Sequence, residues 1–194
     1  MSLRIGGGFL KGRVLKGPRS KSYRPLTGRL KRSLFDYLGD TIRGAAVLDF
    51  FAGVGVFGVE ALSRGAARVT FVEKDAALVD FLEDNLRSLG LVDVARVSCE
   101  DVFYYLNVTR PRAPYDVVFL DPPYGRGLAF RTIEELARWP GFGERTLGVA
   151  KTFKKERFAG PPPLALLETR QLGDDNLFFF HKELSASTVR AAQG

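Results

Sequence analysis

The chain contains 194 residues, of which 45% are hydrophobic, enough to bury a core in one domain with a small appendage. Its single cysteine excludes an internal disulfide, and one cysteine with one histidine cannot form a structural zinc site. No apolar run reaches membrane-spanning length, and the first nine residues lack the apolar stretch of a signal peptide. We therefore expect a cytoplasmic, monomeric protein with no bound metal and no membrane partner.

Charge is distributed unevenly along the chain, whose formal net charge is +7. Up to Arg43 there are eleven lysines and arginines and two acidic residues, whereas the remainder has 18 basic and 20 acidic residues. A basic arm on a nearly neutral body is typical of proteins that contact nucleic-acid phosphates. A solubility segment or a disordered basic tail has the same composition, so charge alone leaves these alternatives open.

The basic arm, residues 1–26, has the pattern of a small β-hairpin. Residues 3–5 and 12–16 interleave basic and apolar side chains and flank a glycine-rich turn. A helix capped by Thr27 is expected to follow, through about residue 39. Seven basic residues of the arm and this helix are the candidates for contact with a nucleic-acid backbone: Arg4, Lys11, Arg13, Lys16, Arg24, Arg29 and Arg32.

From Ala45 onward the pattern alternates between strands and helices. We expect strands over residues 46–50, 68–73, 94–98, 115–120 and 146–152, and helices ending near residue 64 and covering 76–89 and 128–139. Residues 164–172 and 177–182 are a predicted hairpin around the turn at 173–176. The alternation predicts an α/β fold over residues 27–184, with a mostly parallel open sheet completed by the C-terminal antiparallel hairpin. Residues 185–194 are expected to form a flexible tail.

A glycine-rich loop directly follows the first of these strands and opens a helix. Open α/β sheets bind ligands at this position, and glycines let the backbone approach a ligand closely. The spacing of three glycines also matches the dinucleotide fingerprint, and a loop built only for tight packing would look the same. The loop supplies six candidate cofactor-binding residues: Asp49, Phe51, Ala52, Gly53, Gly55 and Gly58.

Two carboxylates follow the next two strands. Glu73 ends the second strand, where it can accept hydrogen bonds from both hydroxyls of a ribose, a contact that suits NAD and S-adenosylmethionine equally. Asp101 follows the third strand and can accept from an adenine amino group or cap a helix. Lys74, beside Glu73, is included in the predicted cofactor site.

The sequence Asp-Pro-Pro-Tyr at residues 121–124 comes directly after the clearest strand of the chain. Two consecutive prolines fix the backbone and remove two N–H donors, so that the carbonyl of Pro122 and the carboxylate of Asp121 are two fixed acceptors. Two acceptors suit a planar amino group with two hydrogens, and Tyr124 can stack on the ring that bears it. Asp121, Pro122 and Tyr124 are therefore the candidate catalytic residues for methylation of an exocyclic amine on a base.

These motifs resemble the class I S-adenosylmethionine-dependent amino-methyltransferases, and more closely the RsmD-type 16S ribosomal RNA guanine-N2 methyltransferases. The resemblance spans nearly the whole chain, through residues 4–7, 11–13, 24–25, 60–66 and 121–124. Val54 departs from the family pattern, which usually has serine, and Leu26 separates Pro25 from Thr27. The resemblance implies a Rossmann-like seven-stranded sheet, S-adenosylmethionine as methyl donor with S-adenosylhomocysteine as product, and a guanine of 16S rRNA in a partly assembled small subunit as substrate.

Three other functions remain compatible with the residues alone. A DNA adenine or cytosine amino-methyltransferase uses the same tetrapeptide, although the chain has little room for a target-recognition segment. A NAD-dependent oxidoreductase is supported only by the glycine spacing. A nucleic-acid-binding protein without activity needs only the basic arm.

Overall fold

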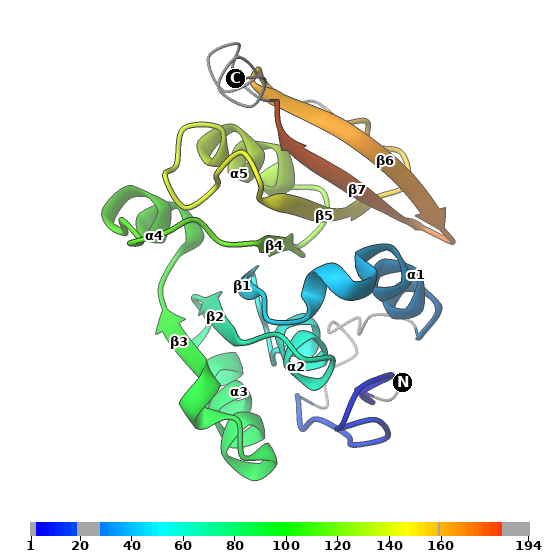
Figure 1. Ribbon diagram of the computed structural model, residues 1–194, viewed down its shortest axis with the longest axis vertical. Coiled ribbons are helices and arrows are strands. Elements are labelled where there is room, and N and C mark those ends of the chain that lie inside the picture. The colour runs from blue at the N-terminus through cyan, green and yellow to red at the C-terminus, as the bar shows by residue number, and fades with distance from the viewer. Residues whose placement is uncertain (1–2, 19–27, 159, 184–194) are drawn as a thin grey trace, which may run out of the picture.

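The computed structural model describes residues 3–18, 28–158 and 160–183. One seven-stranded sheet crosses the molecule in the order β3-β2-β1-β4-β5-β7-β6, from β3 at the lower left of Figure 1 to β6 at the upper right. Its strands are β1 (Ala46–Phe50), β2 (Arg68–Glu73), β3 (Ala95–Cys99), β4 (Val117–Leu120), β5 (Leu147–Phe153), β6 (Leu164–Leu172) and β7 (Asp175–Lys182). Arg24 of the predicted nucleic-acid contacts and the predicted tail, residues 185–194, lie outside the described residues.

The sheet is parallel from β3 through β5 and antiparallel where the last two strands join it. β1 pairs in parallel with both β2 and β4, whereas β7 runs antiparallel between β5 and β6. β1 and β4 are buried at every residue, as expected of apolar central strands covered on both faces. The predicted mostly parallel sheet with a C-terminal antiparallel hairpin is confirmed.

Helices cover both faces of the sheet. One core contains side chains of α1, α2 and α3, with Val47, Phe71 and Phe119 from the strands beneath them. The other contains side chains of α4 and α5, with Leu48 and Phe50 from the opposite face of the same strands. The helices are α1 (Gly28–Leu38), α2 (Val56–Ser63), α3 (Ala76–Leu89), α4 (Val102–Val108) and α5 (Leu128–Leu136), and short 3-10 turns cover Gly39–Ile42 and Val92–Val94.

The arm, described here over residues 3–18, contains no regular strands, so the predicted hairpin is not shown as a strand pair. Its two segments nevertheless lie antiparallel: a bridge joins Arg4 to Val14, and Ile5 N donates to the Arg13 carbonyl over 2.8 Å. The turn between them also bonds to α2, because Phe9 N donates to the Ser63 carbonyl over 2.9 Å and Ser63 Oγ donates to the Gly7 carbonyl over 2.6 Å. Ile5, which is 1% exposed, fixes the arm to the core below α1 and α2.

A buried carboxylate ties the arm to two helices. Glu60 of α2 is fully buried and accepts from Gly6 N at 2.7 Å and from Arg64 Nε at 3.0 Å. Lys31 of α1 lies 3.4 Å from the same carboxylate and also donates to the carbonyl of Arg4. Lys31 is therefore a structural residue within this basic region, because a buried charge needs a partner.

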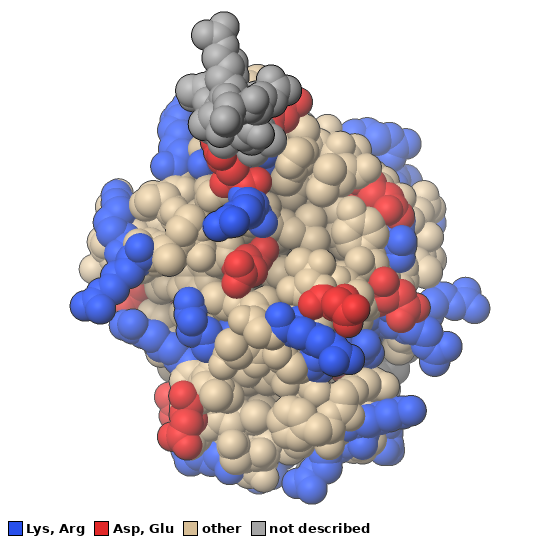
Figure 2. Space-filling view, in the orientation of Figure 1, with Lys and Arg blue, Asp and Glu red and all other residues tan. Residues whose placement is uncertain are grey.

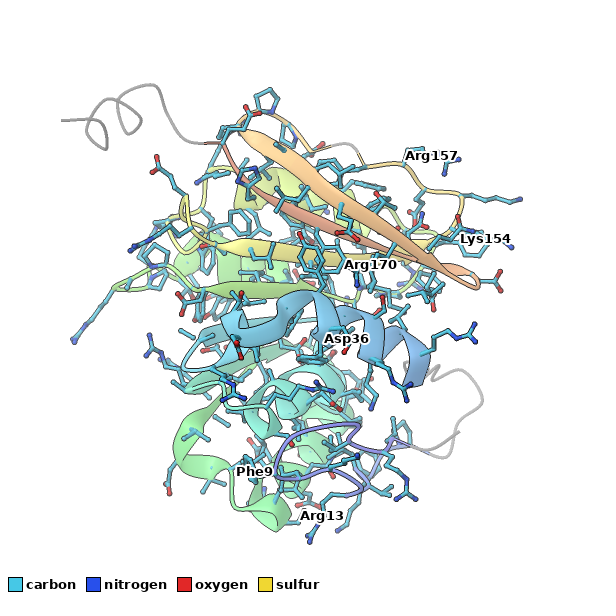
Figure 3. The ribbon with its side chains drawn as sticks, turned by 45° about the vertical axis from the view of Figure 1, so that its right-hand side comes forward. Phe9, Arg13, Asp36, Lys154, Arg157 and Arg170 are labelled. Atoms are coloured by element: carbon cyan, nitrogen blue, oxygen red, sulfur yellow. The ribbon has the colours of Figure 1, made fainter. Side chains whose placement is uncertain are left out.

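Besides the pairing of β7 with β5, the C-terminal hairpin contacts α1. Arg170 of β6 donates from Nη1 to the Ser33 carbonyl over 2.9 Å, and its guanidinium lies 5.0 Å from the centre of the Tyr37 ring (Figure 3). Tyr37 in turn stacks on Phe179 of β7, with ring centres 3.8 Å apart. None of the described helices is long and apolar enough to cross a lipid bilayer.

Candidate active site

A cleft of about 500 Å³ lies at the carboxyl ends of the parallel strands, within the size range of small-ligand sites. It lies where the order of the sheet reverses between β1 and β4, the position at which open α/β sheets bind ligands. The cleft brings together nine of the residues predicted from the sequence: Phe51, Ala52, Gly53, Glu73, Lys74, Asp101, Asp121, Pro122 and Tyr124.

The loop after β1 forms one wall of the cleft. Phe51 has a positive φ of 58°, a conformation uncommon for a residue with a side chain, and this turns the loop sharply at the end of the strand. Gly53 N donates to Glu73 Oε2 over 2.9 Å, and Ala52 N donates to the Val72 carbonyl over 3.1 Å. The loop is therefore held against β2 by hydrogen bonds from its backbone N–H groups.

Three of the predicted loop residues lie behind this wall and do not line the cleft. Asp49 is 1% exposed and its Oδ2 accepts from Gly58 N over 2.9 Å, so that it connects β1 to the start of α2. A methyl group on Gly58 would come within 2.2 Å of the Phe71 ring, and one on Gly55 within 2.4 Å of Leu82. The glycine spacing therefore meets a packing requirement between α2, β2 and α3.

The buried Asp49 carboxyl has an unusual protonation preference. Burial raises the pKa of Asp49 well above its usual range, the hydrogen bond from Gly58 lowers it, and the nearby charges of Asp121 and Glu73 raise it. The second oxygen of this carboxyl, Oδ1, has no hydrogen-bond partner among the described residues. Burial therefore disfavours the charged form of this carboxyl.

Glu73, at the end of β2, and Asp101, at the start of α4, also line the cleft. Besides its bond to Gly53, Glu73 accepts from Asp75 N through Oε1 over 2.9 Å, and each oxygen keeps a further acceptor site. Asp101 Oδ1 accepts from Phe103 N over 2.9 Å and caps α4, while Oδ2 lies 3.7 Å from Lys74 Nζ. Asp101 thus takes the capping role that we weighed and still lines the cleft.

At the other end of the cleft, four side chains from β5, β7 and the loop after β4 form one cluster. Lys151 Nζ lies 2.7 Å from Asp121 Oδ1 and 4.6 Å from the centre of the Tyr124 ring. The Tyr124 hydroxyl donates to Asp175 Oδ1. Only about a fifth of the Asp121 side chain is exposed, and less than a tenth of the Lys151 side chain.

Charge and burial oppose each other in this cluster. Burial raises the pKa of Asp121, the Lys151 ammonium lowers it, and Asp175 adds a smaller upward shift. Burial lowers the pKa of Lys151, but Asp121 and Tyr124 together raise it above its usual value. Burial and the bond to Asp175 raise the pKa of Tyr124. The lysine therefore remains charged, and Tyr124 keeps its hydroxyl proton.

Sequence reasoning missed Lys151 and Asp175. We assigned Asp175 to the turn of the C-terminal hairpin, but it is the first residue of β7. Lys151 had a recognisable signal, because a lysine within an otherwise apolar strand requires a buried partner. Since Leu120 pairs with Ala150 in the parallel register, the next residues along these strands are Asp121 and Lys151.

The predicted nucleic-acid contacts that the structure describes are all exposed. Arg4, Lys11, Arg13 and Lys16 project from the arm, and Arg29 and Arg32 from α1. In Figure 2 basic side chains project at the lower right, where Figure 1 places the arm, and no acidic group shows among them in this view. The arm runs along α2 from Ser63, at the end of that helix, to the cofactor loop. There Asn85 of α3 joins the two segments, because its Nδ2 donates to the Lys16 carbonyl over 3.0 Å and to the Val54 carbonyl over 3.3 Å.

The sheet order, the cleft and the tetrapeptide that begins at Asp121 together define a class I S-adenosylmethionine-dependent methyltransferase. The chain belongs to the RsmD family, since the family described as "Conserved hypothetical protein 95" matches residues 3–181. This confirms the resemblance drawn from the sequence motifs and favours the methyltransferase hypothesis over the oxidoreductase.

Individual relatives agree with this assignment. Ribosomal RNA small subunit methyltransferase D of Haemophilus influenzae is 34% identical over 172 residues, which cover 88% of this chain and 89% of that protein. The protein of the same name from Escherichia coli strain K12 is 42% identical over 134 residues, 69% of this chain and 66% of that protein. A solved structure, "Putative methyltransferase yhhF from Escherichia coli", is 32% identical, has a TM-score of 0.85, and covers 95% of this chain and 100% of its own.

Proposed function

We propose that this protein transfers a methyl group from S-adenosylmethionine to the exocyclic N2 amine of a guanine in small-subunit ribosomal RNA. The observation that carries the proposal is the position of Asp121, a partly buried carboxylate at the end of β4 that faces the same cleft as the cofactor loop. Membership of the RsmD family and the names of its relatives support the choice of substrate.

The cofactor-binding half of the cleft fits S-adenosylmethionine. Glu73 has acceptor sites for a ribose, Asp101 lies where an adenine amine can reach it, and the backbone at Gly53 offers a close approach for the methionine end. Val102 and Phe103 provide apolar surface for a purine ring. When bound, S-adenosylmethionine supplies an electrophilic methyl group on a positively charged sulfur.

The residues of the other half prepare the acceptor amine. The lone pair of an exocyclic amine is delocalised into its ring, which makes the amine a poor nucleophile. Asp121 and the carbonyl of Pro122 accept hydrogen bonds from its two N–H groups, which raises the electron density at the nitrogen as the methyl group arrives. The nitrogen becomes acidic once methylated, so that its proton leaves without a strong base. Tyr124 provides a ring on which the base can stack after it leaves its helix.

The exposed basic residues complete the substrate site. We assign contact with the RNA backbone to the exposed Arg4, Lys11, Arg13, Lys16, Arg29 and Arg32, and also to Arg24, which lies outside the described residues. Such contacts position the RNA without reading its sequence. We further propose that the active form is a monomer. Size-exclusion chromatography with light scattering tests this part of the proposal.

The decisive experiment maps methylated guanines in ribosomal RNA by mass spectrometry. A strain that lacks its own RsmD-type enzyme is compared with the same strain producing this protein. We expect one additional N2-methylguanine in 16S rRNA and none in 23S rRNA. The purified protein is then given naked 16S rRNA, small-subunit particles or duplex DNA with tritiated S-adenosylmethionine, and we expect transfer to the particles. Transfer to DNA alone, or to none of these substrates, overturns the proposal.

A further inference from the structure

Lys151 of strand β5 lines the cleft. Lys151 lies between Ala150, which is fully buried, and Thr152, which is 1% exposed, and its own side chain is only 8% exposed. Burying an ammonium group is costly unless a charge and hydrogen bonds compensate it. A lysine at this position therefore requires an oppositely charged partner, and it changes the protonation of that partner.

The partner is Asp121. Lys151 Nζ donates to Asp121 Oδ1 over 2.7 Å, so the lysine bonds to Oδ1 and not to Oδ2. The other titratable groups near Asp121 are two carboxyls, Asp49 from β1 and Asp175 from β7. Among these neighbours Lys151 supplies the compensating positive charge. The same ammonium lies over the Tyr124 ring, an arrangement that attracts a cation to the ring face.

We propose that Lys151 is a positioning residue for methyl transfer, which keeps Asp121 charged, presents one carboxylate oxygen to the acceptor amine and fixes the ring of Tyr124. The proposal rests on the proposed function, because it assigns the acceptor end of the same cleft. Lys151 acts through Asp121 and Tyr124 and needs no contact with the base itself.

The physical reason is the direction of hydrogen bonding. A charged carboxylate accepts from an amine, whereas a protonated carboxyl has one oxygen that donates. Asp121 is pushed toward protonation by burial and by Asp175, and Lys151 opposes this push. Without the lysine, the pKa of Asp121 rises, so that at neutral pH a larger fraction of the protein has lost the charged acceptor that the reaction needs.

The first test compares K151M, K151R and the control K155M, whose parent Lys155 is exposed and follows β5. The rate of methyl transfer to small-subunit particles at saturating substrates is measured from about pH 5.5 to 9. Activity falls at low pH as Asp121 is protonated, and in K151M we expect this fall to move to higher pH by about 1–3 units, the usual effect of one adjacent opposite charge. K151R should keep the wild-type profile at a lower rate, and K155M should match wild type. An acid limb in K151M at the wild-type pH overturns the proposal.

The second test uses the reciprocal variant and does not depend on activity or on the folding of K151M. In D121N the buried Lys151 loses its carboxylate, so that its pKa should fall, which is followed through the nitrogen chemical shift of ¹⁵N-labelled lysine. An unchanged titration of Lys151 in folded D121N overturns the proposal. If wild type transfers no methyl group to RNA while this titration shifts as expected, the proposed substrate is wrong and the coupling of Lys151 to Asp121 stands.

Discussion

The two halves of the cleft are constructed in different ways. The cofactor half is held by backbone N–H groups that donate to carboxylates: Gly58 to Asp49, nine residues apart, and Gly53 to Glu73, 20 residues apart. The acceptor half is held by side chains that bond to each other over longer separations, Lys151 to Asp121 over 30 residues and Tyr124 to Asp175 over 51. The comparison shows that the cofactor half depends on loop conformation, whereas the acceptor half depends on the assembly of the sheet.

The largest effect is expected from the acceptor half. Replacing Asp121 with alanine removes an acceptor aimed at the reacting amine, and losing one preorganised partner of a transition state costs about 100-fold or more in kcat. Because the Asp121 side chain bonds to Lys151 whereas Gly53 bonds to Glu73, we expect the affinity for S-adenosylhomocysteine to change little. Single-turnover methyl transfer and calorimetric binding measure the two quantities. Full activity in D121A would mean that this half does not handle the amine.

We expect E73Q, in the cofactor half, to have a smaller effect than D121A and to weaken cofactor binding more than it slows methyl transfer. The substitution weakens the acceptor that serves both Gly53 and the ribose, and hydrogen bonds to charged groups are worth about 1.5–3 kcal/mol. The dissociation constant for S-adenosylhomocysteine should rise about tenfold or more, while kcat at saturating cofactor changes less. E83Q, in an exposed ion pair on α3, is the matched control. Equal binding by E73Q and wild type would remove Glu73 from the cofactor site.

Substitution of Gly58 separates packing from ligand contact within the cofactor half. An added methyl group would meet the Phe71 ring at 2.2 Å, and overpacking of a core typically costs about 1–3 kcal/mol of unfolding free energy. We expect G58A to lose this stability in urea denaturation. G28A, where a methyl group meets open space, should not lose it. Unchanged stability with weakened cofactor binding would instead make Gly58 a direct part of the cofactor site.

The smallest effect is expected outside the cleft. The variant K11Q/R13Q removes two exposed charges from the arm, and each lost phosphate contact lowers the salt dependence of binding by about 0.7–0.9 in log–log slope. RNA affinity should fall modestly at physiological salt, with kcat unchanged at saturating RNA. The control R112Q removes an exposed charge from the loop before β4. A changed kcat would show that the arm also influences the cleft.

The sequence was sufficient for the sheet and for most of the cofactor half, because both depend on local patterns. A buried parallel strand has an apolar sequence, and the glycine-rich loop that follows it is recognisable in the same stretch, as at residues 46–58. The attachment of the arm to α2 was not predictable, since it depends on Glu60 and Ser63, which bond to the arm from 54 and 56 residues further along the chain. Asp175 was not predictable because its role depends on where β7 enters the sheet.

The position of β7 has a consequence for the order in which the protein is made. Asp175, which anchors Tyr124, begins the last described strand, whereas β1, β2 and β3 are translated consecutively and well before it. Translation proceeds from the N-terminus, so an emerging chain contains the cofactor loop before it contains the wall behind Tyr124. Under the proposed function, an emerging chain can therefore complete its acceptor site only after the hairpin of β6 and β7 has emerged.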